Sequence, residues 1–245
     1  MYGVSMTCNG PTSMNRLLAG TLISGTALLG LPLSACHSLT FFYSAEAIEG
    51  LVVDAQTGTP LEGVIAVAHW QLNGGFEGGT PVKELQILET VTDRTGRYSF
   101  PAWGPRFALT GYLEEYAPSI LFFKPGYKFL GVSNDHWYPG MDTSKSDWSG
   151  RTVKLEPFKG TLAQYAEHMS SFNYDLWSIG FAVGYHSGDY CGWKSFPRML
   201  KTMDELEEQL KPLRLMHRTV AAQLRAVNTQ LRAAGCGTVT DLIGK

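Results

Sequence analysis

Between residues 48 and 156, short hydrophobic runs alternate with clusters of Gly, Pro, Asp and Thr. In segment 84–92, the apolar residues Leu85, Ile87 and Val91 fall on alternate positions, the period of a strand with one buried face. Strand-like runs about ten residues apart, joined by turns, are typical of an antiparallel β-sandwich. We therefore predict strands over 48–54, 61–68, 84–92, 97–100, 119–124, 127–132 and 152–155, with a Gly-rich loop at 73–81.

One turn in this region has a pronounced signature. The tetrapeptide Asp93-Arg94-Thr95-Gly96 ends in glycine and lies between the alternating run and the strand-like Arg97-Tyr98-Ser99-Phe100. Two strand-like runs joined by a short turn that ends in glycine predict a β-hairpin.

After Pro157 the pattern changes to a helical one. Thr161 is a candidate N-cap for a first helix. A second helical run begins near Ser195 or Lys201, and Gly235 ends it. Because Pro212 lies inside this run, we predict a kink or a split there. The narrow apolar seam is compatible with a coiled coil, but a helical hairpin is the preferred interpretation; its apolar positions are Met203, Leu206, Leu210, Leu213, Val220, Leu224, Val227 and Leu231.

The N-terminal 35 residues look like a leader. They contain no acidic residue and a single basic one, Arg16, which is followed by an apolar run of 17 residues at 17–33. This run contains Pro32 and three glycines, and it is short for a membrane-spanning helix of about 20 residues. Its composition is typical of the core of a secretory signal.

The leader ends in Leu33-Ser34-Ala35-Cys36, which resembles the lipobox of bacterial lipoproteins. The resemblance implies cleavage before Cys36, acylation of this cysteine and anchoring in a lipid bilayer. Because His37 rather than Asp follows, it also implies an outer-membrane lipoprotein that faces the periplasm or the cell surface. Two alternatives remain open: ordinary secretion, for which Ala45-Glu46-Ala47 offers a competing cleavage site, and an uncleaved membrane anchor.

The cysteine count fits an exported protein. Of the four cysteines, Cys8 and Cys36 belong to the leader or its end, so the mature chain keeps Cys191 and Cys236. A pair of cysteines in an oxidising compartment predicts a disulfide, although two free buried thiols remain an alternative. A straight helix between them would separate the thiols by about 55 Å or more. The bridge therefore requires the chain to reverse direction, which we expect near Pro212.

Composition excludes several classes of function. The 245 residues are 44% hydrophobic and 12% aromatic, which excludes extensive disorder. Only 17% are charged, and the net charge of −2 gives no electrostatic basis for binding nucleic acid or an anionic membrane surface.

Three sequence blocks carry a resemblance over residues 46–156. The first block contains Ile48, Gly50, Val52, Asp54, Thr57, Gly58, Pro60, Leu61, Gly63, Val64 and Ala66. The later blocks are Thr92, Asp93, Gly96, Tyr98 and Phe100, then Pro125, Gly126 and Tyr127. Together these blocks resemble the carboxypeptidase regulatory-like domain, a transthyretin-like β-sandwich, although Ala66 departs from the β-branched residue that is usual at its position.

This resemblance implies a fold but no catalytic activity. The module has no catalytic residues of its own, and it implies neither a cofactor nor a metal. We therefore predict a mainly β protein with an α appendage: a signal peptide at 1–35, a linker at 36–45, the sandwich at 46–156 and a helical region at 157–245. The predicted function is that of a non-catalytic interaction or structural module, with a further envelope protein as its partner.

Two weaker hypotheses concern loop residues. Trp137, Tyr138 and Trp148 lie in or beside Gly-rich loops, where exposed rings could stack on the sugar rings of a glycan. A hydrolytic or metal site would need His136 and His186 to meet, together with Asp135 or Asp189. None of the six histidines belongs to an HExxH motif or a zinc-binding spacing, so packing is the preferred interpretation of these histidines.

Overall fold

The structure is a computed structural model, which describes residues 42–74, 80–109, 111–114, 116–135, 144–169, 172, 190–211 and 220–245. The predicted leader and Cys36 therefore lie outside the described residues. None of the helices in these ranges is both long enough and apolar enough to cross a bilayer.

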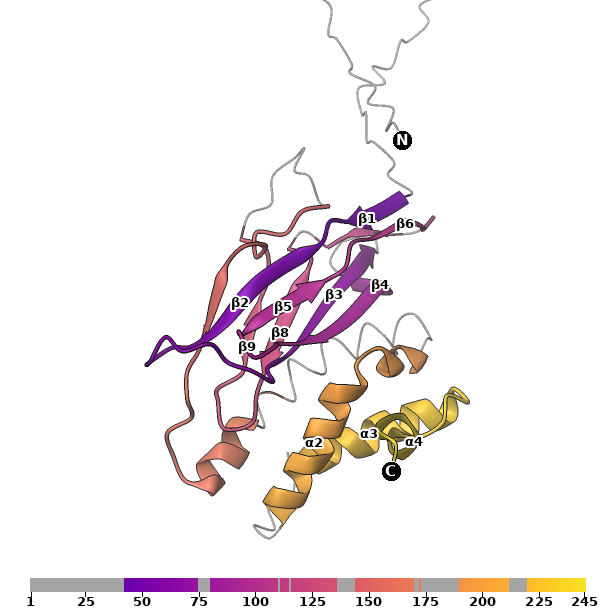
Figure 1. The fold of residues 1–245 in the computed structure, drawn as a ribbon. Coiled ribbons are helices and arrows are strands. Elements are labelled where there is room, and N and C mark those ends of the chain that lie inside the picture. Colours follow the sequence, from indigo (N-terminus) through magenta and orange to yellow (C-terminus); the bar gives the residue numbers. More distant parts are fainter. Residues whose placement is uncertain are drawn as a thin grey trace, which may run out of the picture. The chain divides into compact units, whose positions relative to one another are not determined.

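Ten strands and several helices make up the described part of the chain (Figure 1). The strands are β1 (Phe42–Ala45), β2 (Ile48–Asp54), β3 (Ile65–Gly74), β4 (Thr80–Val91), β5 (Arg97–Phe100), β6 (Trp103–Phe107), β7 (Tyr112–Leu113), β8 (Ser119–Phe123), β9 (Leu130–Val132) and β10 (Thr152–Leu155). The labelled helices are η2 (Tyr190–Ser195), α2 (Pro197–Leu210), α3 (Val220–Ala233) and α4 (Val239–Ile243), and residues 162–169 are also helical.

The strands form two main sheets and a small ribbon. One sheet has the order β10-β2-β5, and the larger has the order β4-β3-β8-β9 with β7 added beside β3. The ribbon consists of β1 and β6. All pairings are antiparallel except that of β10 with β2, which is parallel with Val153 opposite Val52. This arrangement confirms the predicted mainly β class with a helical appendage.

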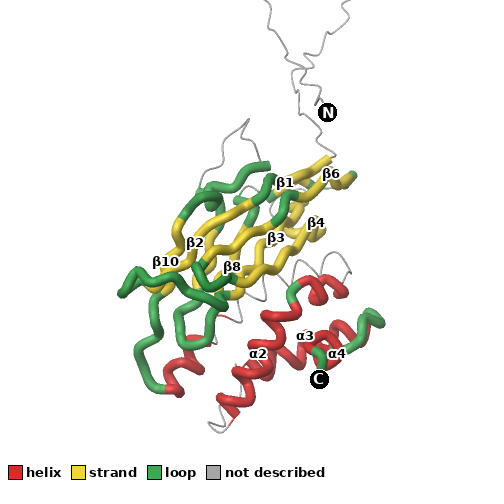
Figure 2. The backbone as a smooth tube through the Cα atoms, viewed as in Figure 1, coloured by secondary structure: helices red, strands yellow, loops and turns green. Residues whose placement is uncertain are grey.

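Strand β3 is buried on both of its faces. Ala66, Ala68 and Trp70 belong to the core between the two main sheets. Ile65 and Val67 point to the other face, where they belong to the hydrophobic cluster made with the helices. The structure thus has three layers, with the larger sheet in the middle (Figure 2).

The helical layer buries the apolar seam that the sequence predicted. Helix α2 contributes Met199, Leu200, Met203, Leu206 and Leu210 to the cluster on the sheet, and α3 contributes Leu224, Val227 and Leu231. The two helices also pack against each other, as a helical hairpin requires. Pro212, near which we predicted the chain reversal, lies outside the described residues.

Several predictions about local structure need correction. The turn at 93–96 forms, with Asp93 N–H donating to the Arg97 carbonyl over 3.0 Å, but β4 and β5 do not make a hairpin. Strand β4 pairs with β3, whereas β5 pairs with β2 in the other sheet. The chain changes sheets here because Thr92, just before the turn, is buried and bonded to the 61–64 segment instead of continuing the strand.

The predicted linker at 36–45 also differs, because its last four residues, Phe42–Ala45, form β1 and pair with β6. Strand β3 begins at Ile65 rather than 61 and runs to Gly74, into the predicted Gly-rich loop.

Candidate functional site

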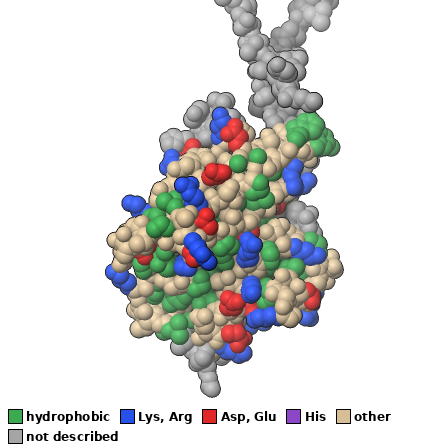
Figure 3. All heavy atoms as spheres, viewed as in Figure 1, with side chains coloured by type: hydrophobic (Ala, Val, Ile, Leu, Met, Phe, Trp, Pro, Cys, Tyr) green, Lys and Arg blue, Asp and Glu red, His purple; other side chains and the backbone are tan. Residues whose placement is uncertain are grey.

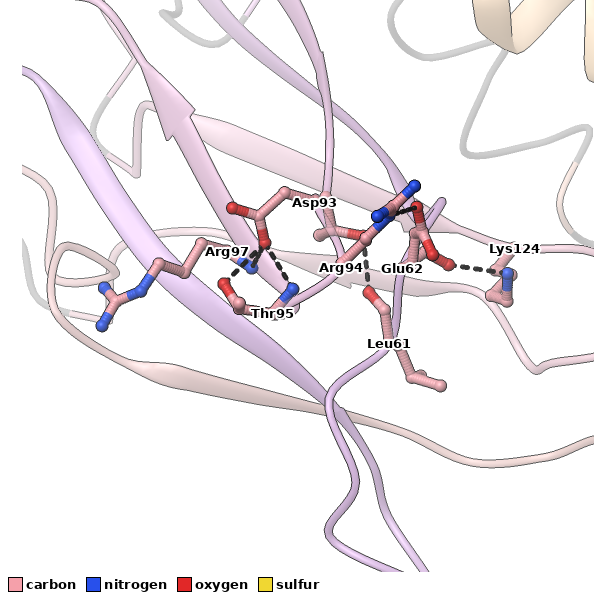
Figure 4. Close-up of polar contacts among 8 residues, drawn as sticks. Leu61, Glu62, Asp93, Arg94, Thr95, Arg97 and Lys124 are labelled. Atoms are coloured by element: carbon pink, nitrogen blue, oxygen red, sulfur yellow. Dashed lines mark hydrogen bonds and ion pairs between the residues drawn. The ribbon is translucent and has the colours of Figure 1, made fainter.

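Polar groups of the turn at 93–96 and of the segment before β3 meet at one corner of the sandwich (Figure 4). The Thr92 hydroxyl donates to the Leu61 carbonyl over 2.6 Å and accepts from the Val64 N–H over 2.9 Å. Lys124 Nζ donates to the Glu62 carbonyl over 2.8 Å. These bonds tie the segment before β3 to residues that follow β4 and β8 in the larger sheet, and Leu61 N–H donates to the Val52 carbonyl of β2 in the other sheet over 2.9 Å. The residues thus serve the architecture.

Two motif aspartates likewise stabilise turns. Asp93 accepts hydrogen bonds from the hydroxyl of Thr95 over 2.7 Å and from the N–H of Arg97 over 3.0 Å, and these bonds lower its pKa. Asp54 accepts from the N–H of Thr57 over 2.9 Å, and this bond is the main cause of the lowered pKa of its carboxyl. The Tyr127 hydroxyl also donates to Asp54 over 3.1 Å, which joins the first and third motif blocks.

A row of buried polar side chains lies on β3. His69, Gln71 and Asn73 are all buried, and Gln71 Nε2 donates to Asn73 Oδ1 over 3.2 Å. His69 Nδ1 lies 3.4 Å from Glu84 Oε1 on β4, an ion pair that is also buried.

Burial and the charge of the partner shift the pKa of each residue of this pair in opposite directions. Burial lowers the pKa of His69, but the carboxylates of Glu84 and Glu114 outweigh it and give a net upward shift. Burial raises the pKa of Glu84, and His69 offsets this effect only in part. The pair can therefore hold a proton that an exposed histidine would release near neutral pH. Within the described ranges no group of three His, Cys, Asp or Glu is placed to hold a metal ion.

This pair was not predicted from the sequence. A signal was present, because His69, Gln71 and Asn73 recur every second residue after the apolar run 64–68. Their pairing with Glu84 depends on the register of β4 against β3, with a shift between Trp70 and Gln71. The sequence does not specify that register.

Of the predicted glycan-binding residues, only Trp148 lies within the described ranges. Its ring is half-buried against the core between the sheets, and its Nε1 donates to the Ser133 carbonyl over 2.7 Å. The Arg151 guanidinium lies 5.4 Å from the ring centre. Trp148 thus takes part in packing, and the glycan hypothesis depends on Trp137 and Tyr138, which lie outside the described residues.

Most of the predicted histidine site also cannot be placed in the structure. His136, His186 and Asp189 lie outside the described residues. Asp135 is described: its carboxylate lies 3.8 Å from Arg151 Nη1, and its N–H donates to Asp147 over 3.0 Å. Asp135 is therefore engaged in a surface network with neighbouring loop residues.

The predicted disulfide is present. Cys191, in η2, is bonded to Cys236, just after α3, and their Cα atoms are 5.6 Å apart across 45 residues of sequence. This confirms that the chain reverses direction between the two cysteines. Trp193 is fully buried beside the bridge, and its Nε1 donates to Gln230 Oε1 on α3 over 2.8 Å.

No family model and no curated protein matches the sequence. Among solved structures, the chain is similar over 47% of its length to the 3-chlorocatechol 1,2-dioxygenase from Rhodococcus opacus 1CP, at 16% identity and a TM-score of 0.31. It is similar over 47% to a streptococcal ancillary pilin, at 14% identity and 0.27, and over 56% to a 9R-lipoxygenase from Cyanothece PCC8801, at 11% and 0.26. The chain covers 60%, 30% and 23% of these three chains.

Proposed function

We propose that this protein is a non-catalytic module of a bacterial cell envelope, anchored in the outer membrane by acyl chains on Cys36, which acts by binding another envelope protein. Its sandwich is of the carboxypeptidase regulatory-like type in this proposal. The motif residues supply turns and sheet corners in the structure, which is consistent with a module that carries no chemistry of its own.

The observation that carries the proposal is the bridge between Cys191 and Cys236. Disulfides form and persist in oxidising compartments and are rare in the cytosol. The bridge lies within the helical layer, where it joins η2 to a residue just after α3. A leader that ends in Leu33-Ser34-Ala35-Cys36 would export the domain that follows it.

The anchor is tested by producing the full chain in a bacterium with two membranes. We expect the protein in the detergent-extracted membrane fraction, and mass spectrometry should find an N-terminal peptide that begins at acylated Cys36. Cys36→Ser should abolish both acylation and cleavage, whereas Ser38→Ala, two residues further on, should change neither. A soluble protein without acyl groups would overturn the anchored-module proposal.

The partner is tested by crosslinking in intact cells before extraction. We expect one envelope protein in stoichiometric amount. Recovery of the acylated protein without a partner would contradict the proposed binding of another envelope protein, but it would not contradict the proposed anchoring through Cys36.

A further inference from the structure

Two exposed aromatic side chains face each other on the ribbon of β1 and β6, and an exposed leucine, Leu109, follows β6 two residues after its end. Phe42 lies opposite Phe107 in the antiparallel pairing, and their ring centres are 5.2 Å apart. Phe42 is 62% exposed, Phe107 53% and Leu109 71%. We call Phe42, Phe107 and Leu109 the aromatic tip; Figure 3 shows hydrophobic side chains gathered at this end of the ribbon.

The base of the tip is held firmly by the sandwich. Tyr43, the residue after Phe42, is buried, and its hydroxyl donates to the Gly111 carbonyl over 3.3 Å. Arg106, the residue before Phe107, donates from Nη1 to the Leu85 carbonyl of β4 over 2.9 Å. Because both ribbon strands are fixed in this way, the two rings are presented outward at little further cost in conformational entropy.

The position of the tip in the chain indicates what it contacts. Phe42 follows Cys36 by only six residues, and six residues of extended chain span at most about 20 Å. No Asp, Glu, Lys or Arg occurs from residue 17 to residue 45. Neither β1 nor β6 contains an acidic residue. An uncharged tether and exposed aromatic rings suit a bilayer interface.

We propose that the aromatic tip inserts into the bilayer interface beside the anchor, which gives the domain a fixed orientation on the membrane. This inference rests on the proposed acylation of Cys36. Acyl chains alone would leave the domain free to rotate about its tether, whereas a second contact through Phe42 and Phe107 restrains it. Burial of each ring in the interface is expected to slow release from the membrane by about tenfold.

The test uses the full chain as it is recovered from membranes, reconstituted into vesicles of phosphatidylethanolamine with a minority of phosphatidylglycerol. Leu109→Cys supplies a thiol for an environment-sensitive dye, with Cys191 and Cys236 kept bridged. Leu162→Cys is the matched control: Leu162 is also exposed, at 47%, and begins the helix 162–169, well away from β1 in Figure 1.

We expect blue-shifted emission and protection from an aqueous quencher at position 109, and neither change at position 162. Replacing both rings, Phe42→Ser with Phe107→Ser, should remove the shift while the far-ultraviolet circular dichroism is unchanged. Solvent-like emission at position 109 would overturn the insertion. Mass spectrometry of the same sample reports acylation separately. If Cys36 is not acylated, Cys8→Ser with Cys36→Ser confines the dye to position 109, and the shift there on added vesicles still decides whether the tip binds lipid; its absence overturns the inference.

Discussion

The backbone N–H of Met199, in the first turn of α2, donates a 2.8 Å hydrogen bond to the carboxylate of Glu89 on β4, 110 residues earlier in the chain. Arg198 N–H donates to the same carboxylate over 3.1 Å. The N-cap residue of this helix, Phe196, offers no side-chain cap of its own. A strand of the central sheet therefore caps the helix that covers it, which fixes where the helical layer begins.

Two substitutions of Glu89 should distinguish its role as a hydrogen-bond acceptor from the effect of its negative charge. Glu89→Ala removes the cap, and we expect a loss of about 1–2 kcal/mol in the free energy of unfolding. Glu89→Gln keeps an acceptor oxygen; because burial raises the pKa of this carboxyl, removal of its charge should cost much less. Urea unfolding followed by circular dichroism compares the two variants, and equal losses would contradict the capping role.

The buried pair of His69 and Glu84 should make stability depend on pH. The folded-state pKa of His69 is raised, so its contribution is complete below the unfolded value of about 6.5 and is lost as pH rises through the folded value. The raised pKa of Glu84 acts in the same direction, since ionisation of the buried carboxyl is disfavoured in the fold. We expect the free energy of unfolding to fall above pH 6.5, by up to about 1.4 kcal/mol per pH unit for one proton.

The double variant His69→Gln with Glu84→Gln is the control for this pH dependence. It removes both titrating groups and should flatten the profile in that range. An unchanged slope would show that other groups cause the dependence.

Loss of the disulfide should weaken the helical layer. The bridge closes a loop of 45 residues, for which the chain-entropy estimate is about 4 kcal/mol. Cys191→Ser with Cys236→Ser should lower the free energy of unfolding by roughly this amount, and reduction of the unaltered protein should reproduce the loss. Thermal unfolding with and without reductant measures both, and insensitivity to reductant would contradict the prediction.

Two motif glycines should respond differently to the same substitution. Gly58 and Gly96 have φ of 70° and 74°, so alanine at either is strained by about 1–2 kcal/mol. At Gly96 an added Cβ would also lie 2.5 Å from the Val52 carbonyl oxygen, whereas at Gly58 it meets nothing within 4 Å. Gly96→Ala should therefore cost about 1–3 kcal/mol more than Gly58→Ala. Equal losses in denaturant unfolding would show that only the backbone strain matters.

Local sequence patterns predicted correctly those elements that depend on interactions between residues close together in the chain. Strand β2 and the helix capped by Thr161 fall where the sequence placed them, and Gln164 N–H donates to the Thr161 hydroxyl as the cap requires. The hairpin prediction at 93–96 failed because a turn signature is local, whereas the partner of each flanking strand is not. Thr92 bonds to Leu61 and Val64, about 30 residues away, and this contact directs β5 to the other sheet.

The mainly β class, the later helices and the chain reversal that the disulfide requires were predictable from the sequence, because hydrophobic period, caps and cysteine count can be read without knowing which segments pack together. The burial of β3 on both faces, the capping of α2 by Glu89 and the contact of His69 with Glu84 emerge only in the folded chain. These contacts join residues far apart in the chain. They depend on strand order and register, which come from the packing of whole layers, so no local pattern specifies them.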